Sequence, residues 1–139
     1  MGYLGNKLQG KYHKDTFQTA VNMAWPAIVE SFFIAFAGLV GAVRNFDPDR
    51  WDAACYDIVK AGNLAKFSQN PELWDYLKST GTRILVEASP RDRIWGIGMG
   101  KSNPDAADPA KWRGTNLLGF ALTEVRDILL EKESGGSGR

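Results

Sequence analysis

The chain has 139 residues, which suits one domain with one hydrophobic core. Apolar residues make up 44% and charged residues 24%, which argues against wholesale disorder, and the net charge of +1 gives no strong nucleic-acid signal. Cys55 is the single cysteine and His13 the single histidine. They leave no internal disulfide, no metal site and no histidine-based triad, and they suit a reducing, cytoplasmic location.

The N-terminal third consists of a polar stretch and a long apolar one. We expect residues 1–15 to be flexible and residues 16–43 to form an apolar helix, interrupted only by Pro26 and Glu30. Two interpretations stay open: a buried helix kinked at Pro26, or a membrane segment. A glutamate near the middle of a membrane segment would cost about 2.5 kcal/mol or more. The segment lacks the basic start and cleavage site of a signal peptide.

The next two elements are helices with similar start signals. In "NFDPDRW", Asp47 can cap a helix and Pro48 suits its first turn, which predicts a helix to about Ser68. In "QNPELWDYLKSTG", Asn70 is the expected cap and Gly81 ends a short helix.

The remainder alternates between regular and irregular segments. "RILVEA", from Arg83 to Ala88, predicts a strand. Residues 89–113 form a long loop, a kind of segment that often carries function. "TNLLGFALTEVRDILLEK" predicts a last helix, and residues 132–139 a flexible tail. The expected fold is therefore mainly α with a small β component.

The stretch "ASPRDRIWGIG" places residues suited to a sugar-binding pocket on the loop. Asp92 can accept hydrogen bonds from sugar hydroxyls or face a cationic transition state, and Trp95 offers a flat surface to a base. Gly96 and Gly98 let the backbone approach a ligand closely. The alternative is that Asp92 caps a turn and Trp95 fills the core.

Two further positions could bind phosphate. Asn116 in "WRGTNLLG" lies at a helix start, where anions bind, and Arg113 and Arg126 could add positive charge. The alternative for Asn116 is a helix cap. Lys66 in "NLAKFSQNPEL" is either a ligand or a solvated lysine beside a core aromatic residue.

Together these motifs, from Arg44 to about Leu130, resemble the NADAR family. "KFSQNPEL", "LVEASPRDRIWGIG" and "GTNLLGFALTEVR" occur in order with family-like gaps. The family comprises small, helix-rich N-glycosidases that act on riboflavin-biosynthesis intermediates or remove ADP-ribose from nucleobases. The resemblance implies a NADAR-like single domain over residues 44–131 and no cofactor.

The resemblance also implies roles for individual residues. Trp51, Asp92 and Trp95 would line the pocket for the ribose and the base, with Asp92 as the catalytic carboxylate. From their charge rather than from the resemblance, Lys66 and Arg126 could meet a 5-phosphate. The remaining motif positions that match are Gly96, Gly98, Gly114, Asn116 and Gly119.

The N-terminal part departs from the family pattern. The family carries a presumed catalytic glutamate there, and only Glu30 in "VESFF" could replace it. Residues 16–40 weakly resemble the first transmembrane helix of multidrug-and-toxin-extrusion transporters. The segment could therefore be foreign, and the chain a fusion.

The expected function is an N-glycosidase-like hydrolase acting on a small phosphoribosyl or ADP-ribosyl compound. The alternatives are a catalytically impaired nucleotide- or ADP-ribose-binding module and a membrane-tethered fusion fragment, with membrane contact through residues 17–43. Binding without product would favour the module, and a requirement for detergent would favour the fragment.

Overall fold

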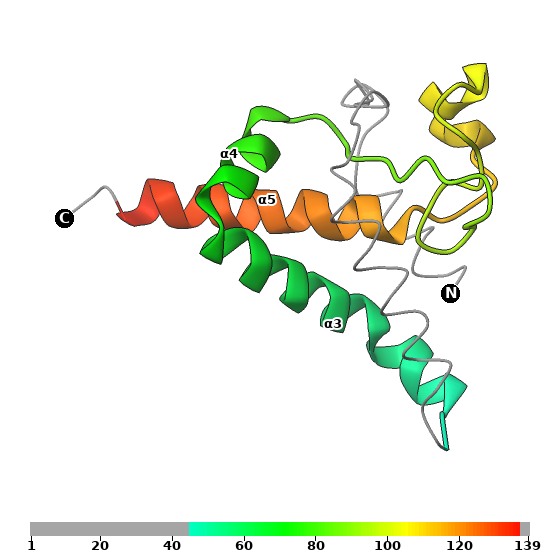
Figure 1. The fold of residues 1–139 in the computed structure, drawn as a ribbon, viewed down its shortest axis with the longest axis horizontal. Helices are drawn as coiled ribbons and strands as arrows, with labels where there is room; N and C mark the ends of the chain where they lie inside the picture. The colour runs from blue at the N-terminus through cyan, green and yellow to red at the C-terminus, as the bar shows by residue number, and fades with distance from the viewer. Residues whose placement is uncertain (1–44, 137–139) are drawn as a thin grey trace.

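The computed structural model describes residues 45–136. They form helices α3 (Pro48–Gln69), α4 (Pro71–Ser79) and α5 (Leu117–Gly136), and the short 3₁₀ helices η2 (Pro104–Ala107) and η3 (Pro109–Lys111). Figure 1 shows α5 in the centre, α4 above it, α3 below it, and the loop with η2 and η3 at the end opposite the C-terminus. This part of the chain is mainly helical, as the sequence predicts.

The cap of α3 forms as predicted, whereas Asn70 occupies the predicted N-cap position of α4 without a side-chain capping bond. The side chain of Asp47 accepts hydrogen bonds from the N–H groups of Asp49 and Arg50 at 3.1 and 3.2 Å. Asn70 separates α3 from α4, and its side chain makes no capping bond to α4. Its amide donates to the carbonyl of Lys66 at 2.6 Å, because the last carbonyls of a helix have no N–H partner within the helix.

One core cluster joins all three helices to the segment before the loop. Its buried residues are Val59, Phe67, Leu77, Leu85, Leu118, Leu122, Val125 and Leu129. A second cluster packs Tyr56 of α3 and Ile84 against Leu117, Phe120 and Ala121 of α5. Helices α3 and α5 are also joined by an ion pair of 3.2 Å between Lys60 and Glu124. The apolar face of α5 therefore organises the described part of the domain.

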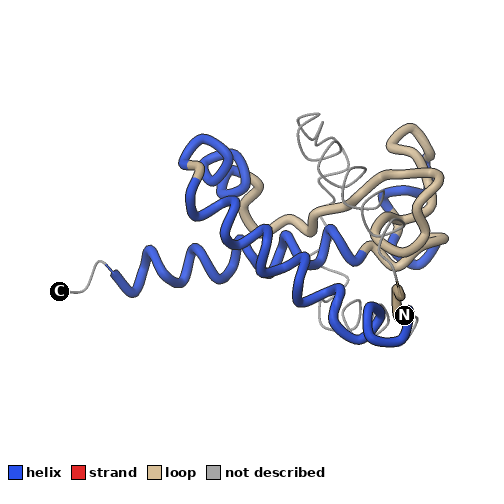
Figure 2. The backbone as a smooth tube through the Cα atoms, turned by 60° about the horizontal axis from the view of Figure 1, so that its bottom comes forward, coloured by secondary structure: helices blue, strands red, loops and turns tan. Residues whose placement is uncertain are grey.

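The predicted strand at Arg83–Ala88 is wrong: no residue between 45 and 136 is in a strand, and Figure 2 shows this segment as loop. A strand requires a second extended segment beside it. Here a side chain of α5 and one from the residue just before α5 take that place along one edge. The hydroxyl of Thr123 accepts from the N–H of Leu85 at 3.3 Å, and Asn116 accepts from the N–H of Glu87 at 2.9 Å.

The 89–113 loop contains more local structure than its composition predicts. The side chain of Asn103 accepts from the N–H of Asp105 at the start of η2, and that of Asp108 accepts from the N–H of Ala110 at the start of η3. A core cluster of its own holds the loop, with Val86, Ile97, Met99 and Ala106 buried. The loop is therefore packed and can hold side chains in fixed positions.

Helix α5 runs to Gly136 and so includes the first residues of the segment predicted as a flexible tail. Within residues 45–136, no helix is long and apolar enough to cross a membrane. The predicted apolar helix at residues 16–43 lies outside the described residues, as does the predicted flexible N-terminus at residues 1–15.

Candidate functional site at the start of α5

The loop before α5 folds back onto the start of that helix. The carbonyl oxygens of residues 93–97 accept hydrogen bonds of 2.9–3.2 Å from N–H groups between Arg113 and Leu118. Leu117 and Leu118 lie in the first turn of α5, where free N–H groups would bind an anion. Because their N–H groups are already bonded, the phosphate site predicted at this helix start lacks those donors.

Asp92 is fixed near the start of this loop. Its Oδ1 atom accepts hydrogen bonds from the N–H groups of Ile94 and Trp95, at 2.9 and 2.8 Å. Its carbonyl accepts from the N–H of Gly98 at 2.9 Å. The turn-capping alternative is thus correct for Oδ1. The two hydrogen bonds set the orientation of the carboxylate. Asp92 is half-buried, so part of it faces solvent.

Gly96 and Gly98 are required by the close packing of this loop. A Cβ atom at Gly96 would lie 2.9 Å from the carbonyl oxygen of Glu87 and 3.0 Å from that of Asp92. Gly98 has a φ of +66°, which other residues adopt only at a cost. Its N–H is already bonded to Asp92, so it does not serve as a donor to a ligand.

Trp95 is half-buried and packs against both clusters that contact α5. Its backbone is held at both ends, because its N–H donates to Asp92 and its carbonyl accepts from Leu118 at 3.1 Å. The core-filling alternative therefore accounts for much of the indole.

Asn116 ties the 83–88 segment to α5. It is fully buried and has a φ of 53°, in the left-handed region. Its Oδ1 accepts from the N–H of Glu87 and its Nδ2 donates to the carbonyl of Leu85, both at 2.9 Å. Both amide groups thus bond to backbone, which makes Asn116 a positioning residue in this geometry.

Arg126 is buried at the start of the 83–88 segment. Its exposed fraction is 2%, and one guanidinium nitrogen donates to the hydroxyl of Thr80 and to the carbonyl of Arg83, both at 2.7 Å. The guanidinium therefore joins α5 to the end of α4. The prediction that Arg126 meets a 5-phosphate does not fit a side chain this enclosed.

Trp51 and Lys66 lie at opposite ends of α3. Trp51 is in the first turn, half-buried, with its ring centroid 6.3 Å from that of Phe46. Figure 1 places this start of α3 apart from the 89–113 loop. Lys66 lies beside the start of α4, 5.6 Å from the centroid of the Phe67 ring, and burial lowers the pKa of its amine. The described residues thus bring neither side chain to Asp92, and Glu30 lies outside them.

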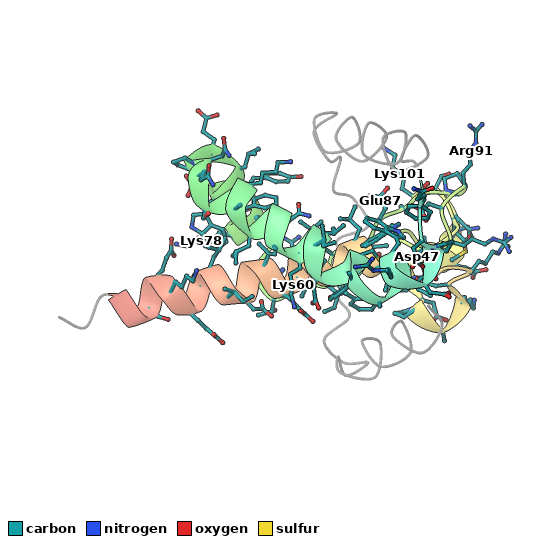
Figure 3. The ribbon with its side chains drawn as sticks, turned by 90° about the horizontal axis from the view of Figure 1, so that it is seen from below. Asp47, Lys60, Lys78, Glu87, Arg91 and Lys101 are labelled. Carbon is teal, nitrogen blue, oxygen red and sulfur yellow. The ribbon has the colours of Figure 1, made fainter. Side chains whose placement is uncertain are left out.

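A cavity of about 330 Å³ lies where α3, α4 and α5 meet. It is lined by Phe67, Ser68, Pro71, Trp74, Leu129, Lys132 and Glu133. The carboxylate of Glu133 accepts hydrogen bonds from Lys78, which Figure 3 labels between α4 and α5, and from the indole of Trp74 at 2.6 Å. These bonds lower the pKa of Glu133. The lining of this cavity includes none of the residues predicted for the site.

Comparison with known proteins places the same motifs in a family. The model of the NADAR domain matches residues 11–130. The chain belongs to the NADAR family. The matched range also takes in residues 17–43, which were expected to lie outside the family-like region.

The chain is similar to curated proteins that carry N-glycosidase names. It is 49% identical over 85 residues to an N-glycosidase of Acanthamoeba polyphaga mimivirus, covering 61% of this chain and 50% of that protein. It is 30% identical over 79 residues to the N-glycosidase YbiA of Escherichia coli, covering 57% and 42%. It is also 34% identical over 80 residues to a chloroplastic riboflavin biosynthesis protein of Zea mays, covering 58% and 11%. The chain thus spans about half, or less, of these relatives.

Sequence reasoning about this NADAR domain missed two residues. Thr123 bonds to the 83–88 segment, but a threonine inside a helix gives no sequence signal for such a contact. The other is Arg93, which is exposed and whose side chain lies beside Gly98. The charged run "RDR" is the signal that could have drawn attention to this residue.

Proposed function

We propose that this NADAR chain is a hydrolase that cleaves the N-glycosidic bond of a phosphoribosyl or ADP-ribosyl compound. The observation that carries the proposal is the carboxylate of Asp92, held through Oδ1 by two backbone N–H groups. The names of the viral and bacterial relatives support the reaction class. That of the maize relative supports a riboflavin-pathway intermediate as substrate.

The reaction needs a fixed negative charge beside the sugar. The bond between C1 of the ribose and the base nitrogen breaks, and its electron pair stays on the nitrogen. Water adds its oxygen to C1 and a water proton ends on the nitrogen. The sugar passes through a cationic, oxocarbenium-like state that a fixed carboxylate stabilises. Both side-chain hydrogen bonds of Asp92 end on Oδ1, so we assign Oδ2 to face this cation.

Other residues have supporting roles in this proposal. Trp95 would contact the planar base through its ring. Glu30 would supply a second carboxylate to activate water or assist the leaving group.

Asp92→Asn is expected to lower kcat by about 100-fold or more, the typical effect of removing one electrostatic contact to a transition state. The asparagine keeps an oxygen that can accept the two backbone N–H bonds, so only the negative charge is removed. The measurement is release of ribose 5-phosphate from a phosphoribosylamino-pyrimidine substrate, with thermal unfolding as a check of folding.

Asp108→Asn is the matched control, because Asp108 lies on the same loop and also accepts a backbone N–H, at 3.0 Å. The kcat of the Asp108→Asn variant should stay within about twofold of that of the unsubstituted chain, which is a change in activation free energy below about 0.5 kcal/mol. Unchanged turnover in Asp92→Asn would remove Asp92 from catalysis. Substrate binding without turnover in the unsubstituted chain would instead favour a binding module.

A further inference from the structure

Two arginine side chains of the loop approach the same point of the backbone. A Cβ atom built on Gly98 would lie 3.0 Å from Cγ of Arg93 and 3.1 Å from Cβ of Arg113. Both arginines are exposed. Two positively charged side chains therefore start beside the same glycine, although they are far apart in the sequence.

No acidic side chain in the described part of the chain neutralises this arginine pair. The hydrogen bonds and ion pairs between residues 45 and 136 include none from either guanidinium. The acids of the loop are bonded elsewhere: Asp92 to backbone N–H groups, Asp105 to Lys111 at 2.6 Å, and Asp108 to the N–H of Ala110. Like charges in one place repel each other, and binding an anion relieves that repulsion.

The backbone under the pair is held rigidly and lies next to Asp92. The N–H of Gly98 donates to the carbonyl of Asp92, and the N–H of Arg113 donates to the carbonyl of Ile97, both at 2.9 Å. The carbonyl of Arg93 accepts from the N–H of Thr115 at 2.9 Å. The starting points of both side chains are thus fixed before a ligand arrives, which reduces the entropy lost on binding.

We propose that Arg93 and Arg113 bind the phosphate group of the substrate beside the carboxylate of Asp92. A guanidinium can donate two parallel hydrogen bonds to phosphate oxygens, and two guanidinium groups match the charge of a phosphate monoester. This proposal rests on the proposed function, since it names the part of the substrate that these side chains hold. It gives the arginine pair the role that the sequence assigned to Lys66 and Arg126.

Arg93→Gln and Arg113→Gln are each expected to raise KM about tenfold, with kcat within about twofold of the unsubstituted chain. The dissociation constant of ribose 5-phosphate, measured by isothermal titration calorimetry on the full chain, should rise by the same factor. Binding of ribose without phosphate should not change. The same titration with ADP-ribose shows whether the pair holds a phosphate monoester or a diphosphate, according to which of the two affinities falls more.

Arg91→Gln is the matched control, since Arg91 is exposed on the same loop and Figure 3 shows it extending away from the ribbon. It removes the same charge without touching Gly98. Equal weakening by Arg91→Gln, or unchanged affinity in both test variants, would overturn the proposal. The unsubstituted chain could also show no turnover while it binds ribose 5-phosphate, and Arg93→Gln and Arg113→Gln could lose that binding. This result would keep the phosphate site and reject the hydrolase.

Discussion

Gly119→Ala is expected to lower the free energy of unfolding by about 3 kcal/mol, although alanine favours a helix more than glycine does. Gly119 lies in α5 against the 83–88 segment. A Cβ atom there would lie 2.1 Å from the carbonyl oxygen of Leu85 and 2.5 and 2.6 Å from the amide atoms of Asn116. Backbone cannot move aside as a side-chain tip can, so the segment would separate from α5. Chemical denaturation followed by circular dichroism measures the change.

Gly62→Ala is the matched control, because Gly62 lies inside α3 with nothing within 4 Å of the added Cβ. This substitution should raise the free energy of unfolding by about 0.5–1 kcal/mol, the usual helix preference of alanine. The two substitutions are chemically identical and should have opposite signs. A stabilising Gly119→Ala would mean that the 83–88 segment does not pack on α5 as described.

Asn116→Ala is expected to lower the free energy of unfolding by about 4 kcal/mol. The substitution leaves the half-buried N–H of Glu87 and the buried carbonyl of Leu85 without partners, at about 1–3 kcal/mol for each group. It also places alanine at a φ of 53°, which adds about 1 kcal/mol of strain. The same denaturation experiment measures the effect.

Two further variants separate these contributions. Asn116→Gly removes the same hydrogen bonds without the strain, so it should be less destabilising than Asn116→Ala by about 1 kcal/mol. Asn70→Ala removes an exposed amide that bonds to one carbonyl, and it should cost no more than about 1 kcal/mol. Equal effects of Asn70→Ala and Asn116→Ala would contradict the central role of Asn116.

The helices could be predicted because their signals are local. Asp47, the proline after it and the helical spacing of apolar residues lie within a few turns of one another. The strand prediction failed because a strand depends on a partner elsewhere in the chain. "RILVEA" has strand-like composition, but its bonded edge meets the side chains of Asn116 and Thr123. Composition does not show whether an extended segment bonds to another strand or to side chains.

The site could be predicted where its parts are neighbours in the sequence. Asp92, Trp95, Gly96 and Gly98 form one loop, and the structure holds them together. The burial of Arg126 could not be predicted because a charged residue on a helix is usually exposed, whereas this one bonds to groups far away in the sequence. The arginine pair at Gly98 depends on the contact of two distant segments, which the sequence pattern does not encode.

The proposed reaction is tested most directly by product analysis with the unsubstituted chain. The protein is incubated with the phosphoribosylamino-pyrimidine intermediate, and free pyrimidine and ribose 5-phosphate are measured together. Equimolar release of both, dependent on enzyme concentration, is the predicted result. Absence of both products from a chain that unfolds cooperatively and binds the compound would contradict the hydrolase and leave only the binding role.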